Sequence, residues 1–368
     1  MRNWMGLLAI CLMASCAPVA APSPSGTSPS ATTAGAAASA AADTFTMPTD
    51  RDMITFAADR GALIAFSTKD APPPYESKIQ RADATTSAWR TIYTSDSHFS
   101  AGRVVSGRVA LAEYREPYQG GGAYSVDFIV VDVATGTATA FDHFALTSAT
   151  FHGGGGGPRH PVGSIVLGPD RAAWTQLVEG PGGSVTGELR LALVADPTHA
   201  MPIASSAEWV APLGLDAHRL LYVLGGKTQD QLHIRDLDTG ADRVVTTGAV
   251  GDQQREGGIP GFNAAVLAGD RAMWLDRPAA SGTIRSVNVV SGAERTFVTG
   301  GSSCAEPTAG TRFVAWYCAT AGAILDAMTL EPAPNLPVGV APVASDDALL
   351  WFTVVPNGRT VTLYRPRP

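Results

Sequence analysis

The feature that most constrains the fold of this chain is a short pattern that recurs along it. Each copy is a tight polar turn, often ending in Arg, followed at once by a short apolar run. The two clearest copies are Pro169–Trp174 and Gly269–Trp274. Looser copies begin at Arg60, Arg108, Arg219, Arg312 and Asp347. Seven copies at a spacing of roughly 35 to 65 residues indicate a solenoid, a propeller or another array.

The segments between the copies predict short antiparallel strands. Leu232–Leu237, for example, is followed by the turn Asp238–Gly240 and then by Arg243–Thr246. Gly in such a turn accepts the positive φ that a hairpin requires. Strand, tight turn, strand, long loop, strand, tight turn, strand is the order of one propeller blade. Helical periodicity is hard to find after residue 43.

The two ends of the repeat region predict that the ring closes on itself. The chain stops one strand short of a seventh blade, and Thr44–Met47 is an alternating segment with no neighbour of its own. An N-terminal strand that completes the last blade would remove two exposed sheet edges. We therefore predict an all-β fold, a β-propeller over residues 43–368, with seven four-stranded blades closed by an N-terminal strand. Six blades remain an alternative if one weak copy is misassigned.

The repeat also resembles a known kind of propeller. Its turns read Asp-Leu-Asp-Thr-Gly at 236–240 and Val-Val-Ser-Gly at 289–292. Together with the recurring turn and apolar run, they resemble bacterial WD40-like and TolB-like propeller repeats, although the Gly-His and Trp-Asp dipeptides of strict WD40 repeats are absent. The resemblance covers most of residues 44–368. It implies a binding platform, usually for proteins, and a fold alone does not fix the function.

The first 42 residues predict an export address. Arg2 precedes a mostly apolar run, Trp4–Met13, which is too short to span a bilayer. Leu12–Cys16 then resembles the lipobox of bacterial lipoproteins, with Met13 where the family usually has Leu. The resemblance implies a signal peptide over residues 1–15 and lipidation of Cys16. An ordinary secretory signal with a chance Cys is the alternative.

Residues 16–42 predict a disordered tether, because Ala, Ser, Thr, Pro and Gly cannot bury enough apolar surface to offset the entropy of ordering. The protein is thus expected to be exported and held by lipid on the periplasmic or cell-surface side. Its formal net charge of −7 argues against nucleic acid as a partner. The expected partner is an envelope protein or polymer, and the expected state is a monomer.

One face of the predicted propeller carries the long loops, and scaffolded loops often hold binding residues. Tolerated insertions are the alternative. The candidate binding residues in these loops are His152, Arg159, His160, Asp252, Gln253, Arg255 and Glu256. No carboxylate or Cys stands at ligand spacing beside the two histidines, so no metal is expected, and no cofactor either. The glycines between them lack the GxxxxGK[ST] pattern of a phosphate-binding loop.

Aromatic residues and cysteines predict structural roles. At the second-strand position the chain repeats Trp174, Tyr222, Trp274, Trp316 and Trp351. Packing between blades is the preferred interpretation, and a carbohydrate-stacking surface is the alternative. Cys304 and Cys318 fall on the first two strands of the sixth unit, within reach of a disulfide in an exported protein. The Arg of the repeated turn is expected to be solvated or locally hydrogen-bonded.

The preferred function is therefore a lipid-anchored, non-catalytic binding platform. The alternative is a propeller enzyme, such as a glycan hydrolase or lyase, with its site at the central channel. The carboxylates are scattered mostly in turns, and no G-x-S-x-G, H-E-x-x-H or EF-hand pattern is present. A structural member of an envelope assembly is a third hypothesis.

Overall fold

A computed structural model gives the fold of the chain. It describes residues 41–46, 53–69, 76–83, 88–115, 124–146, 164–249, 265–276, 283–298, 305, 307–318, 321–332, 342–355 and 358–365. These residues belong to one compact unit, Ala40–Pro368. In this part of the chain the secondary structure is β, apart from the short 3-10 turn η2 (Pro181–Gly183).

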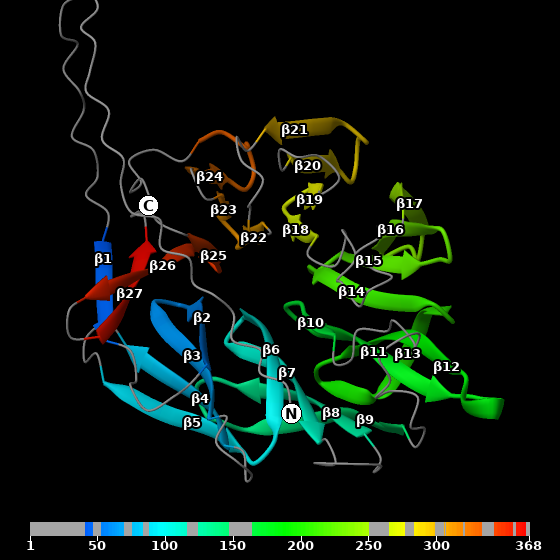
Figure 1. Ribbon diagram of the computed structural model, residues 1–368, viewed down its shortest axis with the longest axis horizontal. Coiled ribbons are helices and arrows are strands. Elements are labelled where there is room, and N and C mark those ends of the chain that lie inside the picture. The colour runs from blue at the N-terminus through cyan, green and yellow to red at the C-terminus, as the bar shows by residue number, and fades with distance from the viewer. Residues whose placement is uncertain are drawn as a thin grey trace, which may run out of the picture. The chain divides into compact units, whose positions relative to one another are not determined.

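The strands form seven antiparallel sheets arranged in a ring around a common centre (Figure 1). The first blade contains β2 (Met53–Asp59), β3 (Ala62–Lys69), β4 (Glu76–Asp83) and β5 (Trp89–Ser95). The second contains β6 (His98–Val105), β7 (Arg108–Arg115), β8 (Tyr124–Asp132) and β9 (Ala138–Leu146). The third contains β10 (Ile165–Leu167), β11 (Arg171–Glu179), β12 (Val185–Leu193) and β13 (Asp196–Ser206).

The remaining blades repeat this order. The fourth contains β14 (Trp209–Leu215), β15 (Arg219–Gly225), β16 (Gln229–Asp236) and β17 (Asp242–Ala249). The fifth contains β18 (Val266–Ala268), β19 (Arg271–Asp276), β20 (Thr283–Asn288) and β21 (Glu294–Val298). The sixth contains β22 (Thr308–Ala309), β23 (Phe313–Cys318) and β24 (Ala321–Asp326). The seventh contains β25 (Val343–Ser345), β26 (Ala348–Val355) and β27 (Gly358–Arg365).

The N-terminal strand closes the ring. β1 (Ala41–Thr46) pairs antiparallel with β27, with Phe45 opposite Val361, and so becomes the fourth strand of the seventh blade. The ion pair between Arg365 and Asp43, at 3.2 Å, joins the same two strands. The predicted seven-bladed propeller with an N-terminal closing strand is confirmed. Among the described residues the sixth blade shows three strands.

The apolar core is divided among the junctions between blades. Seven clusters of buried side chains each span two neighbouring blades, and together they cover every junction of the ring. The cluster at the closing junction joins Phe45, Leu350 and Leu363 of the seventh blade to Leu63 and Ala82 of the first. Each blade is apolar on both faces because it packs against two neighbours.

The innermost strands are the elements that the sequence pattern predicted least well. β2, β14 and β18 were not predicted. β18 has three residues, and β14 contains Pro212 and Gly214 at a register shift in its pairing with β15. Pro and Gly weaken a strand signal and are typical of bulges. Within the described ranges, no helix is long and apolar enough to cross a membrane.

Candidate binding faces

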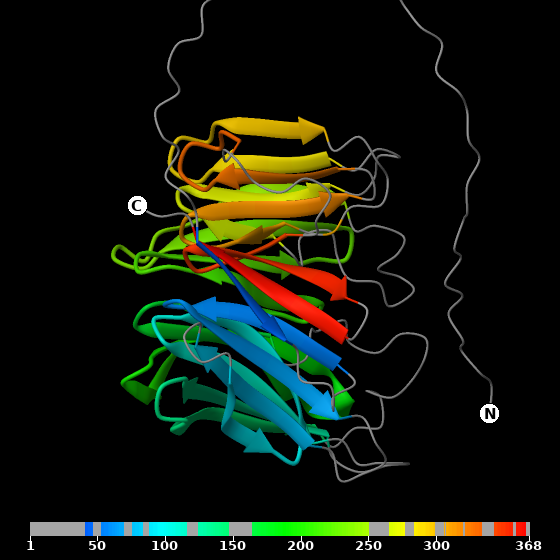
Figure 2. The same ribbon diagram turned by 90° about the vertical axis from the view of Figure 1, so that its left-hand side faces the viewer.

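The antiparallel strand order sorts the connections onto two faces of the ring. Connections from the first to the second strand of a blade, and from the third to the fourth, share one face, here called the turn face. Connections from the second to the third strand, and from blade to blade, share the other, here called the loop face. Seen from the side, the strands run between these two faces (Figure 2).

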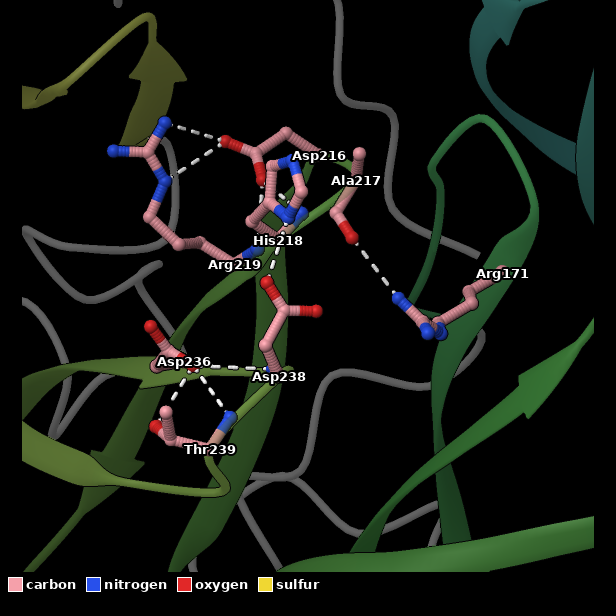
Figure 3. Close-up of polar contacts among 8 residues, drawn as sticks. All are labelled: Arg171, Asp216, Ala217, His218, Arg219, Asp236, Asp238 and Thr239. Atoms are coloured by element: carbon pink, nitrogen blue, oxygen red, sulfur yellow. Dashed lines mark hydrogen bonds and ion pairs between the residues drawn. The ribbon is translucent and has the colours of Figure 1, made fainter.

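The turn face is built from a repeated hydrogen-bonded turn. In the fourth blade, Asp236 Oδ1 accepts bonds from the backbone N–H of Asp238 and Thr239 and from the Thr239 hydroxyl, at 2.7–3.0 Å (Figure 3). Asp132 and Asp326 make the same three bonds in the second and sixth blades, and Asn288 makes the two backbone bonds in the fifth.

These bonds change the titration of the turn carboxylates. The backbone N–H of Thr135 is the largest cause that lowers the pKa of Asp132, and Thr239 and Thr329 do the same to the pKa of Asp236 and Asp326. The bonds stabilise the charged form, so these side chains are ionised at neutral pH. The turns are therefore structural anchors whose polar groups are already engaged.

The Arg of the repeated turn links one blade to the next. Arg219 bonds locally to Asp216 and also reaches Asp270 of the fifth blade, with Nη1 at 2.6 Å from Oδ1. Arg171 donates to the backbone carbonyl of Ala217 on the fourth blade, at 2.9 Å (Figure 3). The local hydrogen bonding was predicted, whereas the contact with the neighbouring blade was not.

The repeated aromatic residues pack between blades. Trp174 is fully buried against Phe128 and Phe141 of the second blade, and its indole N–H donates to Asp142 at 2.8 Å. The other members of the set are at most 8% exposed: Tyr222, Trp274, Trp316 and Trp351. The packing interpretation is therefore confirmed, and burial excludes a carbohydrate-stacking surface at these positions.

A Tyr–His–Asp group on the fourth blade was missed by the sequence analysis. The Tyr222 hydroxyl donates to Asp242 at 2.6 Å, and His233 Nδ1 lies 2.9 Å from the other oxygen of that carboxylate. The rings of Tyr222 and His233 stack at 4.9 Å. Burial raises the pKa of Tyr222, with Asp242 adding to the effect, so the phenol stays protonated. Its members come from β15, β16 and β17, and no sequence spacing marks them as a group.

The candidate binding loops belong to the loop face. By chain order, His152, Arg159 and His160 lie between the second and third blades, and the segment 252–256 lies between the fourth and fifth. All seven candidate residues are outside the described residues, so their role stays a prediction. Among the residues that the structure describes, no group of three His, Cys, Asp or Glu side chains is arranged to hold a metal ion.

One part of the loop face is described in detail at the fourth blade. The indole N–H of Trp209, at the start of β14, donates to the buried carboxylate of Asp230 at 3.0 Å. A Cβ on Gly225 would overlap the Trp209 ring, so Gly is required beside it. The Trp209 ring and the Asp230 carboxylate form a fixed base for the adjoining connection, 226–228.

The cysteines are partly described. Cys318 is buried at the end of β23. The backbone N–H of Ala305 donates to the carbonyl of Tyr317 at 2.7 Å, which brings the chain next to position 304 beside β23. Cys304 itself lies outside the described residues, as does Cys16, so the disulfide and the lipidation stay predictions.

Comparisons with known proteins support the fold and leave the function open. No family model matches the chain, and no curated protein matches it. TolB from Acinetobacter baumannii is 14% identical over 83% of this chain and 82% of that chain, with a TM-score of 0.39. A prolyl endopeptidase is 12% identical over 86% of this chain and 45% of that chain, with a TM-score of 0.50. An oligogalacturonate lyase in complex with manganese is 12% identical over 85% of this chain and 76% of that chain, with a TM-score of 0.40.

The chain is a β-propeller, and a solved structure of 12% identity and a TM-score of 0.50 supports the fold alone. At identities this low the similarity carries no residue role from one protein to another.

Proposed function

We propose that this chain is an exported β-propeller, anchored by a lipid on Cys16, whose loop face binds an envelope protein or polymer without catalysing a reaction. The observation that supports this proposal most is that short turns lie on one face of the ring and long connections on the other. The turn face is made of short turns, and in the fourth blade the Asp236 carboxylate and the Arg219 guanidinium bond to the protein itself. The loop face holds the long connections, which include every candidate binding residue.

The physical basis is that a propeller gives loops a rigid base. The strand ends beneath the loop face are fixed by buried side chains, such as Trp209 in the core between the fourth and fifth blades. Connections on such a base can change in sequence without disturbing the core. Segments 152–161 and 251–261 contain all seven candidate binding residues.

The test is a cross-linking pull-down from intact cells, made with the full-length protein that carries its own N-terminus. Two variants shorten segments 152–161 and 251–261. The matched control is Val290→Ser, because Val290 is 72% exposed in a turn of the opposite face. Circular dichroism and thermal unfolding establish that each variant is folded.

We expect an enriched envelope protein, or co-sedimentation with the cell-wall polymer, that is lost in the loop variants and kept in the control. Binding that survives both loop variants would show that the loop face is not the binding surface. Binding that is lost in the Val290→Ser control would place it on the turn face instead.

A further inference from the structure

A pocket opens on the turn face at the junction of the second and third blades. Its volume is about 370 Å³, near the lower end of the range for small-molecule sites. From the second blade it is lined by Arg108, Val130, Asp132, Thr135, Thr137 and Thr139. The third blade contributes Pro169, Asp170, Val194 and Ala195.

The junction of the second and third blades lacks an Arg–Asp contact that the junction of the fourth and fifth blades has. Arg108 begins β7 as Arg219 begins β15, and Asp170 precedes β11 as Asp270 precedes β19. Arg219 and Asp270 meet at 2.6 Å. No hydrogen bond or ion pair joins Arg108 to Asp170, although both residues are described, and the pocket lies between them.

The pocket has an apolar floor. Val130 is 3% exposed and belongs to the core between the two blades, against which Val194 also packs. Pro169 and Ala195 add further apolar surface at the side of the third blade. Because Val130 is already almost fully buried, the apolar face of a ligand would remove mainly Pro169, Val194 and Ala195 from water.

The polar groups of the pocket come from three kinds of side chain. The guanidinium of Arg108 donates, the carboxylates of Asp132 and Asp170 accept, and the Thr hydroxyls do both. Asp132 Oδ1 already takes three bonds within its turn, and the Thr135 hydroxyl bonds to Asp132 and to Thr137. These internal bonds hold the turn, while Arg108, Thr139 and Asp170 make no side-chain hydrogen bond within the described structure.

Charge narrows the class of ligand. Two carboxylates against one guanidinium give the pocket a net charge of about −1, which disfavours anions. A simple cation would be repelled by the guanidinium of Arg108, whose charge already helps to lower the pKa of Asp132. A neutral ligand with several hydroxyls satisfies all of these groups, because each hydroxyl both donates and accepts.

We propose that the pocket between Arg108, Thr139 and Asp170 binds a neutral pyranose, such as one sugar unit of a glycan. The C–H face of the ring lies on Val194 and Pro169, and its hydroxyls bridge Arg108 of the second blade and Asp170 of the third. This site is on the turn face, so a test of it does not depend on whether the loop face binds a partner.

The test is saturation-transfer NMR on the folded protein, with D-glucose, D-galactose, D-mannose and N-acetyl-D-glucosamine titrated separately and L-alanine as a zwitterionic probe. Thr139→Val removes one hydroxyl from the pocket with little change of shape. The matched control is Thr296→Val, since Thr296 is also an exposed residue of a fourth strand, in the fifth blade.

We expect saturable transfer from at least one of the four sugars. Thr139→Val should weaken its affinity about fivefold, the effect of one hydrogen bond of about 1 kcal/mol. Thr296→Val should leave it unchanged. Transfer that does not saturate for any of the four sugars would overturn the proposal, as would equal affinity in wild type and Thr139→Val. Saturable binding of L-alanine alone would overturn it too, because the pocket would then select a charge pair.

Discussion

At the scale of single residues, the closing junction places one carboxylate in an unfavourable setting. Asp346 lies in the turn between β25 and β26, where it accepts a weak bond from the backbone N–H of Arg60 at 3.4 Å. Burial raises the pKa of Asp346, and repulsion from Asp347 and Asp59 raises it further. The folded protein therefore holds the Asp346 proton more tightly than the unfolded chain does. The resulting stability is fully present below the ordinary pKa of 3.8 and is lost as the pH rises through the folded value.

Replacing this carboxylate by an amide should stabilise the protein at neutral pH. Asn keeps the acceptor for Arg60 and tolerates the left-handed φ of 51° at position 346. We expect Asp346→Asn to raise the thermal midpoint at pH 7 by about 2 °C, the effect of somewhat less than 1 kcal/mol. The gain should disappear as the pH falls below 3.8, where the wild-type carboxyl is also neutral. Thermal unfolding of both proteins across a pH series measures this, and an equal gain at every pH would contradict it.

Two glycines in equivalent turns provide a matched pair. Gly136 and Gly292 both have φ of 76°, but a Cβ on Gly136 would collide with the backbone carbonyl of Ile92 on the first blade. A Cβ on Gly292 would meet nothing within 4 Å. Gly292→Ala should cost about 1–2 kcal/mol, the price of a left-handed conformation. Leu330 already accepts such a conformation in the sixth blade, with φ of 57°.

Gly136→Ala should cost clearly more than Gly292→Ala, because the turn must also move away from the first blade. Denaturant unfolding of the two variants gives the comparison. Equal losses would mean that the contact between Gly136 and Ile92 contributes nothing to the junction.

At the scale of the strand, Phe45 is the side chain of β1 that enters the core. Phe45 is fully buried among residues of the first and seventh blades, whereas its neighbour Thr44 is exposed. Phe45→Ala should destabilise the protein by about 3–5 kcal/mol, as expected for a buried Phe. Thr44→Ala, on the outer side of the same strand, should cost well under half of this. Chemical denaturation measures both, and similar losses would show that backbone pairing, not Phe45, holds the strand.

Whether a strand could be predicted from the sequence depended on its length and its composition. β15 and β16 were recognised because long apolar alternation and the Asp-Leu-Asp-Thr-Gly turn belong to the local sequence. β2 and β18 were missed because the innermost strands take their stability from neighbouring blades rather than from their own pattern. The closing strand was predicted because the last unit is one strand short and the N-terminal segment Thr44–Met47 has no partner nearby in the sequence. This signal comes from comparing the two ends of the repeat region, not from any local pattern.

Sites proved harder to predict than strands. Arg219 and Asp270 are in contact whereas the corresponding Arg108 and Asp170 are not, and this difference in side-chain geometry cannot be read from the sequence. The Tyr222, His233 and Asp242 group combines residues from three strands, and only the fold brings them together. The loop candidates lie outside the described residues, so for them the sequence is still the only guide.

At the scale of the whole molecule, substitution of a single cysteine tests the proposed lipid anchor. Cys16→Ser removes the only thiol that the lipobox-like sequence offers for acylation. We expect the variant to leave the membrane fraction and to appear in the soluble extracytoplasmic fraction, because a stretch as short as Trp4–Met13 cannot hold a protein in a bilayer. Fractionation with immunodetection measures this, and Arg2→Lys, which keeps the positive charge, is the control. A variant that stays in the membrane fraction would contradict the lipid anchor.

The pairing of β1 with β27 also sets the order in which the molecule is completed. A chain is made from its N-terminus, so β1 exists first and its partner exists last. Every other described blade is assembled from strands that follow one another in sequence, and it requires no distant segment. The ring must therefore remain open until the final strand has emerged, and its closure, the contact of longest sequence separation, is the slowest kind of step to form.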